Sequence, residues 1–374
     1  MKILVVRNSY IIAGAEIYYL KLQHSLRKLN IDCQIILLTN NNDLAKIATS
    51  HNIESYVLNT FSEEVGTKKG LLRLFFNLPD YIYKYISIIH KLKRLHKIDL
   101  VLLSGKTEKY ILTLLKAVID LPIFWIEHGQ VFTPTMSKIA LFLYKFSSNY
   151  CTYILSESND TMNDLIDNGI NPKIIKYIGS GIDHDYFVKT KHNFSKRLIV
   201  GFMATICWEK GVEELTDTLK RVIQVDSTIK FLILGDGPQL SFLKEFIIKN
   251  RLSSRVIAYG RTENVKAQLN RMDILLSPIH HPGGLSLSVQ EAMAMGCIPI
   301  VTDVGGNREL VNSSHGYIHK SDFSINACLN IIELKENINL RKRLSQNARK
   351  YVIKNYSAIQ FTKKLYSFLR KHID

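Results

Sequence analysis

The sequence alternates short apolar strands with amphipathic helices from one end to the other, and no other feature constrains its fold more. From Ala15 onward, for example, apolar residues recur every three or four positions, which is the spacing of one helix face. Alternation of this kind indicates parallel sheets covered by helices on both faces. We therefore predict the α/β class, with strands over residues 3–6, 33–38, 100–103, 123–126 and 152–155 in the first half and 198–203, 230–234, 256–259, 274–277 and 298–301 in the second.

The length of 374 residues exceeds what one hydrophobic core usually serves, so we expect two domains. The segment most like a linker is residues 179–183 together with the polar, basic residues 189–197. We place a first domain at 1–185 and a second at 198–352. Two doubly wound domains facing each other would leave a cleft at the carboxyl ends of their strands. The last segment, 353–374, has helical spacing and could pack back on the first domain.

The five cysteines are widely spaced and mostly lie in apolar segments, so we expect reduced thiols rather than disulfides or a zinc site. The opening run of apolar residues is too short for a signal peptide. No apolar run approaches the roughly 18 residues that cross a bilayer. We therefore expect a cytoplasmic protein.

The net charge of +16 is unevenly distributed, and residues 68–97 mix basic side chains with aromatic and aliphatic ones. Such a mixture can hold a peripheral protein on the inner, anionic face of a membrane. It is equally typical of a solvated helix face above a core stripe. No nucleic-acid recognition motif accompanies the charge, so we do not expect nucleic acid as a partner.

Residues 283–309 predict a phosphate site. A glycine turn at Gly283 and Gly284 precedes a short helix beginning between Ser286 and Val289, and a buried strand then leads to a second glycine turn. The free amides and the positive dipole end of a helix suit a diphosphate. We infer a site that handles nucleotides.

Five segments, in order along nearly the whole chain, resemble one enzyme family. They are Ala13-Gly14-Ala15-Glu16, Gly179-Ser180-Gly181-Ile182-Asp183, Glu209-Lys210-Gly211, Gly235-Asp236-Gly237-Pro238, and the run from Glu291 to Glu309. The family is that of the retaining nucleotide-sugar glycosyltransferases numbered four. The resemblance implies the GT-B fold of two Rossmann-like domains and transfer of a sugar from a nucleotide diphosphate.

The resemblance also implies roles for single residues. Glu291 would hold the ribose hydroxyls, and Lys210 would neutralise the leaving diphosphate in place of a divalent metal. No metal ion and no cofactor beyond the nucleotide sugar is therefore expected. His128 would contact the donor sugar or its reaction centre, and Glu16 would lie on the acceptor side. The residues expected around the donor are Gly14, Thr205, Lys210, Gly235, Arg261, Gly283, Gly284, Leu285, Ser286, Leu287 and Glu291.

Each of these residues also has a structural interpretation. Lys210 would otherwise be a surface lysine, and Glu291 a carboxylate stabilised by its helix dipole. His128 would otherwise be a hydrogen-bonded cap, and Glu16 a solvated glutamate at the start of a helix.

Two positions depart from the family pattern. Gly283 stands where the family has the first of two glutamates, and Thr205 stands where it has an arginine; Arg261 or Arg308 could compensate for the latter. Two functions therefore stay open. The first is a transferase acting on a saccharide or lipid-linked acceptor in cell-surface polysaccharide synthesis, and the second is a nucleotide-binding scaffold or regulatory subunit with little or no activity. Specificity would reside in loops such as 62–78 and 130–138, whose sequences show no interpretable pattern.

Overall fold

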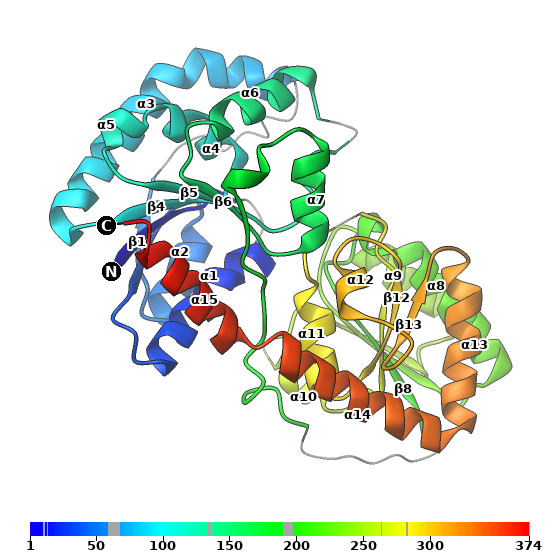
Figure 1. Cartoon of the computed structure of the whole chain (residues 1–374). Coiled ribbons are helices and arrows are strands. Elements are labelled where there is room, and N and C mark those ends of the chain that lie inside the picture. The colour runs from blue at the N-terminus through cyan, green and yellow to red at the C-terminus, as the bar shows by residue number, and fades with distance from the viewer. Residues whose placement is uncertain are drawn as a thin grey trace. The chain divides into compact units, whose positions relative to one another are not determined.

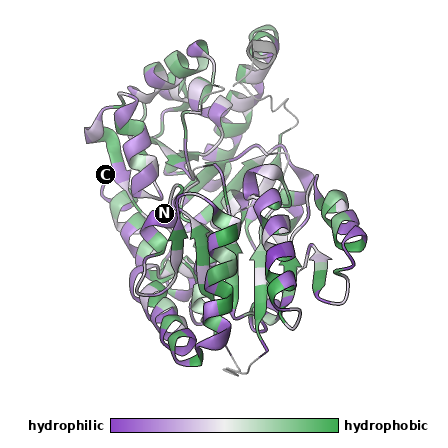
Figure 2. Cartoon of the chain, turned by 90° about the vertical axis from the view of Figure 1, so that its right-hand side faces the viewer, coloured by the Kyte–Doolittle hydropathy of each residue, from purple (hydrophilic) through white to green (hydrophobic). Residues whose placement is uncertain are grey.

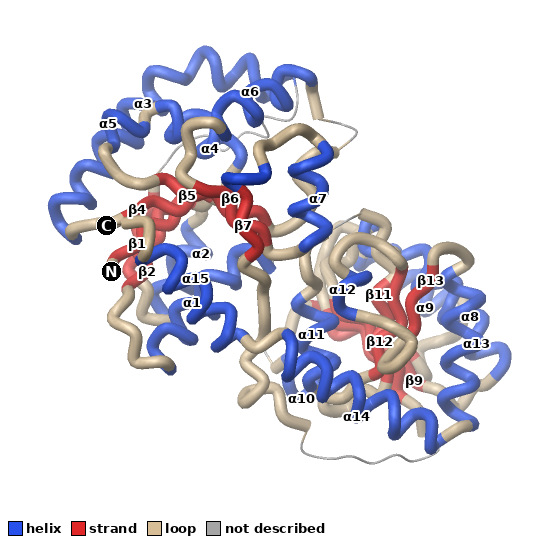
Figure 3. The backbone as a smooth tube through the Cα atoms, viewed as in Figure 1, coloured by secondary structure: helices blue, strands red, loops and turns tan. Residues whose placement is uncertain are grey.

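The computed structural model describes the chain except residues 10–11, 13, 59–67, 134–135, 190–196, 263, 282 and 374, and the side chains of 68–71 and 74. The chain divides into two compact units. Unit 1 comprises Met1–Gly179 and Ala358–Asp374, and unit 2 comprises Ser180–Ser357. Each unit is built around its own parallel sheet, as Figures 1 and 3 show.

The described part of unit 1 forms a seven-stranded sheet in the order β3-β2-β1-β4-β5-β6-β7. All of its strand pairs are parallel, with β1 pairing with both β2 and β4. The strands are β1 (Lys2–Val6), β2 (Gln34–Thr39), β3 (Glu54–Val57), β4 (Leu100–Leu103), β5 (Ile123–Glu127), β6 (Tyr153–Ser156) and β7 (Ile175–Tyr177).

Helices cover both faces of this sheet because its strand residues are apolar on both sides. In β1, Leu4 and Val6 belong to one core cluster, whereas Ile3 and Val5 belong to the other. The first face carries α3 (Lys68–His96), α4 (Lys106–Leu114), α5 (Lys116–Ile119), α6 (Lys138–Ser148) and α7 (Asn159–Asp167). The other face carries α1 (Gly14–Lys28), α2 (Asn42–Ser50) and α15 (Ala358–Arg370).

The described part of unit 2 forms a six-stranded parallel sheet in the order β10-β9-β8-β11-β12-β13. Most of its strand residues are apolar, and apolar residues are green in Figure 2. The strands are β8 (Ile199–Met203), β9 (Lys230–Leu234), β10 (Val256–Gly260), β11 (Ile274–Ser277), β12 (Ile298–Thr302) and β13 (Tyr317–His319).

The helices of unit 2 also lie on both faces of its sheet. The large core cluster joins one face to α8 (Val212–Val225), α9 (Leu240–Lys249) and α13 (Phe323–Glu336). On the other face α11 (Leu287–Ala294) and α14 (Ile338–Asn355) pack against each other and against β12. Short helices α10 (Val265–Leu269) and α12 (Asn307–Leu310) complete the described elements, with the 3₁₀ turns η1 (Pro172–Ile174, in unit 1) and η2 (Trp208–Lys210).

The division of the chain differs in detail from the boundaries expected from sequence. Residues 180–185 belong to unit 2, because the amide of Ile182 donates to Tyr356 O at 3.0 Å and Ile182 forms a bridge with Ser357. At the other end, α14 continues to Asn355, so the chain returns to unit 1 only at Ala358. Residues 190–196 of the expected linker lie outside the described residues.

One local expectation is wrong. Residues 68–78, expected in a loop, form the first turns of α3, which continues through Pro79; residues 62–67 lie outside the described residues. The segment Glu209-Lys210-Gly211 forms the end of η2 and the turn before α8, which begins at Val212. None of the helices described combines the length and apolarity that a membrane span requires.

Candidate functional site

Unit 2 brings most of the expected donor residues to the carboxyl edge of its sheet. The strand order reverses direction between β8 and β11, so the loops that follow these two strands diverge from a switch point. Open α/β sheets bind ligands at such points. The β8 loop carries Thr205 and Lys210, and the β11 loop carries residues 283–287.

Gly211 allows the turn that contains Lys210 to pack closely against the β11 loop. Its φ of 79° lies in the left-handed region, and a Cβ at this position would overlap Pro278 O. His280 adds two further links from the β11 loop, since its amide donates to Glu209 O at 3.0 Å and its Nε2 lies 2.7 Å from Glu214 Oε2. The position of Lys210 is therefore fixed by backbone contacts on both sides of the switch point.

Gly235 brings the β9 loop against the β8 loop in the same way. Its φ is 135°, and a Cβ there would overlap Ala204 O. The amide of Ile206 donates to Asp236 O at 2.9 Å, so Thr205 lies between two backbone contacts to the β9 loop. The side chain of Thr205 occupies the position where the family has an arginine.

Helix α11 begins where the sequence predicts. Ser286 is its N-cap, and the Ser286 hydroxyl accepts a hydrogen bond from the Val289 amide at 3.4 Å. The amides of a first helical turn have no partner within the helix, so they are available to an anion. Glu291 lies one turn further on and is partly exposed, whereas Leu285 in the preceding loop is buried.

The second glycine turn, at Gly306, packs against the first, at Gly283 and Gly284. The Gly306 amide donates to Gly283 O at 3.1 Å, and a Cβ on Gly306 would lie 2.6 Å from Gly284 O. A Cβ on Gly283, by contrast, would meet nothing within 4 Å. Packing thus requires glycine at position 306 but leaves room for a side chain at position 283.

The two arginines that could compensate for Thr205 differ in their surroundings. Arg261 follows β10 directly and is exposed. The guanidinium of Arg308 donates from Nε to Asp303 Oδ1 at 2.6 Å, so a carboxylate already balances part of its charge. Arg261 is therefore the better candidate for an additional phosphate contact.

In unit 1, His128 follows β5 directly and lies among aromatic and acidic side chains. Its Nδ1 is 2.9 Å from Glu157 Oε2, and its Nε2 is 3.2 Å from the Tyr19 hydroxyl. The rings of Tyr18 and Tyr19 meet the imidazole edge to face. Burial raises the pKa of both phenols, so Tyr19 keeps its proton and can donate it to the ring.

Glu157 was missed by the sequence analysis. It follows β6, the neighbour of β5, and its amide donates to Glu127 O at 3.3 Å, which places the two strand ends side by side. A carboxylate can only accept, so Glu157 favours the tautomer of His128 with the proton on Nδ1. The signal that could have found Glu157 is its place at the carboxyl end of a strand adjacent to β5.

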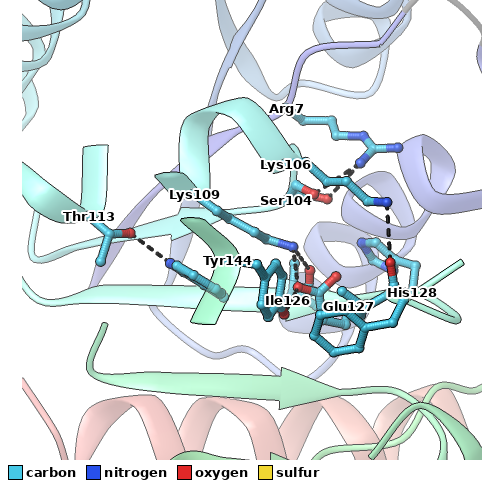
Figure 4. Close-up of polar contacts among 12 residues, drawn as sticks. Arg7, Ser104, Lys106, Lys109, Thr113, Ile126, Glu127, His128 and Tyr144 are labelled. Atoms are coloured by element: carbon cyan, nitrogen blue, oxygen red, sulfur yellow. Dashed lines mark hydrogen bonds and ion pairs between the residues drawn. The ribbon is translucent and has the colours of Figure 1, made fainter. Parts of the chain in front are cut away.

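Glu16 is buried rather than solvated, so that interpretation of Glu16 is wrong. Only 2% of its surface is exposed, and Arg7 donates to Glu16 Oε1 from Nη2 at 2.6 Å and from Nε at 2.9 Å. Arg7 also contacts Ser104 at the end of β4 through Nη1, as Figure 4 shows. Gly14 begins α1, and Ala13 lies outside the described residues.

A second buried carboxylate, Glu108, lies at the switch point of unit 1. Its Oε1 accepts hydrogen bonds from Tyr81 at 2.8 Å, from Tyr85 at 3.4 Å and from Asn8 at 2.5 Å. Burial raises the pKa of Glu108 above its ordinary value, although its hydrogen bonds and Arg7 act in the opposite direction. Neither Glu108 nor its partners stood out in the sequence.

Beside His128, a buried ion pair holds the end of β5 (Figure 4). Lys109 donates to Glu127 Oε1 at 2.6 Å and to Ile126 O at 2.8 Å, and Tyr144 donates to the same carboxylate oxygen at 2.6 Å. Desolvation lowers the pKa of Lys109, while the Glu127 carboxylate opposes that shift. The pair is structural, because all three side chains are buried.

The cysteines contribute packing rather than chemistry. All five thiols are free, and four of them are buried, namely Cys33, Cys151, Cys297 and Cys328. Cys207 lies on the β8 loop, where burial raises the pKa of its thiol and keeps it protonated. Within the described residues, no group of three or more His, Cys, Asp and Glu side chains is arranged to hold a metal ion.

Family models match almost the whole chain. Residues 12–186 match Glycosyltransferase Family 4, and residues 186–351 match Glycosyl transferases group 1. The chain belongs to this group 1 and family 4 type of glycosyltransferase. An uncharacterized glycosyltransferase, MJ1069, of Methanocaldococcus jannaschii is 25% identical to it over 290 residues, covering 70% of this chain and 73% of the relative.

Two further comparisons concern function and fold. The capsular polysaccharide biosynthesis glycosyltransferase CapM of Staphylococcus aureus is 25% identical over 197 residues, which cover 51% of this glycosyltransferase and 50% of CapM. The crystal structure of Anabaena HepE in complex with UDP superposes with a TM-score of 0.83 at 17% identity, covering 99% of this chain and 100% of HepE. This likeness shows that the fold is the two-domain Rossmann-like GT-B type.

Proposed function

We propose that this glycosyltransferase retains the anomeric configuration of the sugar that it moves from a nucleotide diphosphate to a saccharide or lipid-linked acceptor in cell-surface polysaccharide synthesis. The observation that carries the proposal is the interlocked carboxyl edge of unit 2. Gly211, Gly235 and Gly306 hold three loops against their neighbours and fix Lys210 and the start of α11 at one switch point.

The nucleotide diphosphate is proposed to bind at this edge. The first-turn amides of α11 and the ammonium group of Lys210 provide positive charge for the two phosphates. Glu291, on the same helix, accepts hydrogen bonds from the ribose hydroxyls. HepE, which shares the fold, forms a complex with UDP, and this supports a uridine nucleotide as the first ligand to test.

The reaction breaks the bond between the sugar's anomeric carbon and the diphosphate oxygen, and the electron pair leaves with the phosphate. Lys210 and the helix amides stabilise the charge that develops there, so we propose that no metal ion is needed. The acceptor hydroxyl attacks the same face of the sugar, and its proton passes to the departing phosphate. His128 and Glu16 are the groups of unit 1 that we assign to the sugar and to the acceptor side.

The test is turnover by purified protein with a panel of uridine, guanosine and adenosine diphosphate sugars and with saccharide or lipid-linked acceptors. We expect Lys210→Ala to lower kcat about a hundredfold, because one preorganised donor contributes about 3 kcal/mol to such a transition state. Glu291→Ala should mainly raise KM for the donor. The matched control is Lys230→Ala, at the amino end of β9, away from the carboxyl edge of the sheet. It should leave kcat and KM unchanged.

Two outcomes would contradict the proposal. Equal turnover by wild type, Lys210→Ala and Glu291→Ala would refute the site assignment. A product whose anomeric configuration, measured by NMR, is opposite to that of the donor would refute retention. Full activity in excess chelator is expected, and loss of activity that magnesium restores would overturn the metal-independent mechanism.

A nucleotide-binding scaffold is the second candidate. Thr205 and Gly283 favour it, because each lacks a charged group that the family pattern supplies, and Gly283 is not required by packing. Nucleotide-sugar binding without hydrolysis or transfer to any acceptor would support this function. Gly283→Glu should fold normally, and activity gained by this variant would identify the missing carboxylate as the cause.

A further inference from the structure

Helix α3 exposes an apolar face before Pro79 and buries one after it. Beyond the proline, its apolar side chains Tyr81, Tyr85, Ile89 and Leu92 all lie in the core of unit 1. Before the proline, Leu72 (61% exposed), Phe75 (72%) and Phe76 (73%) lie three and four residues apart, on another side of the helix from the buried residues. The first turns of α3 therefore expose an apolar stripe to solvent.

Helix α6 shows the same division. Ala140 and Tyr144 are buried, whereas Ile139, Phe142 and Phe146 are exposed, Phe142 to 63%. Both helices pack against the same core cluster on one face of the sheet of unit 1, where Figure 1 shows them in one layer. We call the exposed residues 72, 75, 76, 139, 142 and 146 the α3–α6 face.

The charge of these two helices is almost entirely positive. Together they contain nine Lys or Arg residues and one acid, Asp80, which pairs with Lys84 at 2.7 Å. Arg73 lies between Leu72 and Phe75, and Lys138 and Lys145 flank the exposed residues of α6. Exposed aromatic rings are therefore interleaved with basic side chains on both helices.

We propose that the α3–α6 face binds the anionic surface of a lipid bilayer, with its apolar side chains inserted at the headgroup level and its cations among the lipid phosphates. Amphipathic helices with this composition lie in the membrane interface without crossing it. A protein partner fits the composition less well, because the centres of protein interfaces are depleted of lysine. Exposed apolar residues also occur singly in unit 2, such as Val225 and Ile248, and serve as a comparison.

This inference goes beyond the proposed function. It would bring the enzyme to the surface where a lipid-linked acceptor resides, yet membrane binding is measured without any sugar donor. Failure of the α3–α6 face to bind lipid would leave the nucleotide site intact, and failure of catalysis would leave lipid binding intact. The two proposals are therefore tested separately.

The experiment is flotation of the full chain with vesicles of phosphatidylglycerol and phosphatidylcholine, compared with vesicles of phosphatidylcholine alone. Wild type should float with the anionic vesicles and detach as salt is raised. The variant Phe75→Ser/Phe76→Ser/Phe142→Ser should bind about a hundredfold more weakly, because the apolar contribution of three rings is lost. The variant Arg73→Glu/Lys138→Glu/Lys145→Glu should lose its preference for anionic vesicles.

The matched control is Val225→Ser/Ile248→Ser/Leu329→Ser, which removes three exposed apolar residues from unit 2 and should bind like wild type. All variants change side chains that are exposed or partly exposed, so circular dichroism and Tm should match those of wild type. Absence of wild-type binding to anionic vesicles, or equal loss in the control, would overturn the proposal. So would a wild-type dimer, seen by size-exclusion chromatography, that the triple serine variant of α3 and α6 converts to monomer.

Discussion

At the scale of single residues, buried carboxylates organise the carboxyl edge of unit 1. Each of the four lies at the end of a strand, directly after one or in the helix that follows one, and each has a partner within hydrogen-bond distance; they are Glu16, Glu108, Glu127 and Glu157. Parallel strands end at the same edge, so residues far apart in sequence meet there. Among them, Glu157 is the partner of His128, the residue proposed to contact the donor sugar.

Glu157 is expected to act as a positioning residue for His128. Glu157→Gln removes the negative charge that favours the proton on Nδ1 and adds a donor that can face this nitrogen, and a wrong tautomer lowers catalysis even when the geometry persists. We predict a fall in kcat of about tenfold or more, with little change in KM for the nucleotide sugar. Steady-state kinetics measure the split, and Glu54→Gln, which alters the partner of His96 in the same unit, is the control. Equal kcat values for wild type and Glu157→Gln would remove Glu157 from the site.

Glu108 should make stability depend on pH. Burial raises its folded pKa above the ordinary value of 4.5, so the folded chain binds more protons than the unfolded chain above that pH. The free energy of unfolding contributed by this group is full below pH 4.5 and falls as pH rises through the folded pKa. Glu108→Gln removes the titration, so Tm should fall less between pH 4.5 and pH 7 than in wild type. Parallel Tm curves for the two proteins would contradict this assignment.

Single residues at strand ends could be identified from the sequence, but their partners could not. His128 was singled out through the resemblance to the family. Glu157 lies 29 positions further on, and nothing local to it signals a contact. A solvated Glu16 stayed open as an alternative, because its partner Arg7 precedes it by nine residues across the loop after β1 and shows no helical spacing with it. The contact between His128 and Glu157 depends on the order of the strands in the sheet, and that order cannot be read from the sequence.

At the scale of elements, burial decided which strands could be predicted. All ten expected strands are present, with ends shifted by no more than one residue, because each is a nearly continuous apolar run. The strands β3, β7 and β13 were missed. They lie at sheet edges, and most of their residues are partly or fully exposed, so they lack the apolar run that identifies a central strand.

The link between the β8 and β11 loops should depend on Gly211. In Gly211→Ala, the new Cβ would overlap Pro278 O, and the residue would also keep a left-handed φ of 79°. The loss of stability should therefore exceed the cost of the left-handed conformation alone. The variant should also bind nucleotide more weakly. Gly260→Ala is a close control, because its φ is 73° but a Cβ there meets nothing within 4 Å. That variant should lose about 1–2 kcal/mol, the cost of the left-handed conformation. Thermal unfolding measures both, and equal losses would refute the proposed steric link.

At the scale of the whole molecule, the last helix of the chain, α15, packs into the core of unit 1. Leu365 and Leu369 of α15 are buried in the same core cluster as α1 and β1, although more than 300 residues separate them in sequence from β1. The helical spacing of residues 353–374 predicts this helix. Its packing against the first domain was one option that the sequence left open.

Leu369→Ala should therefore destabilise unit 1 and spare unit 2. Truncation of a fully buried leucine costs about 2–5 kcal/mol, through lost burial and a cavity. Hydrogen exchange should accelerate in peptides from β1, β2 and α1 and stay unchanged in β8 and β11. Uniform acceleration across both units would mean that they unfold together, contrary to this expectation.

The central claim is that the switch point of unit 2 binds a nucleotide diphosphate, and thermal stability with and without nucleotide tests it most directly. Ligand at one hundred times its Kd should raise the free energy of unfolding by about 2.7 kcal/mol. We predict that at least one of UDP, GDP and ADP raises Tm for wild type and for Lys230→Ala, and that the shift is much smaller for Lys210→Ala and for Glu291→Ala. No shift with any of the three nucleotides, or equal shifts in all four proteins, would contradict the account.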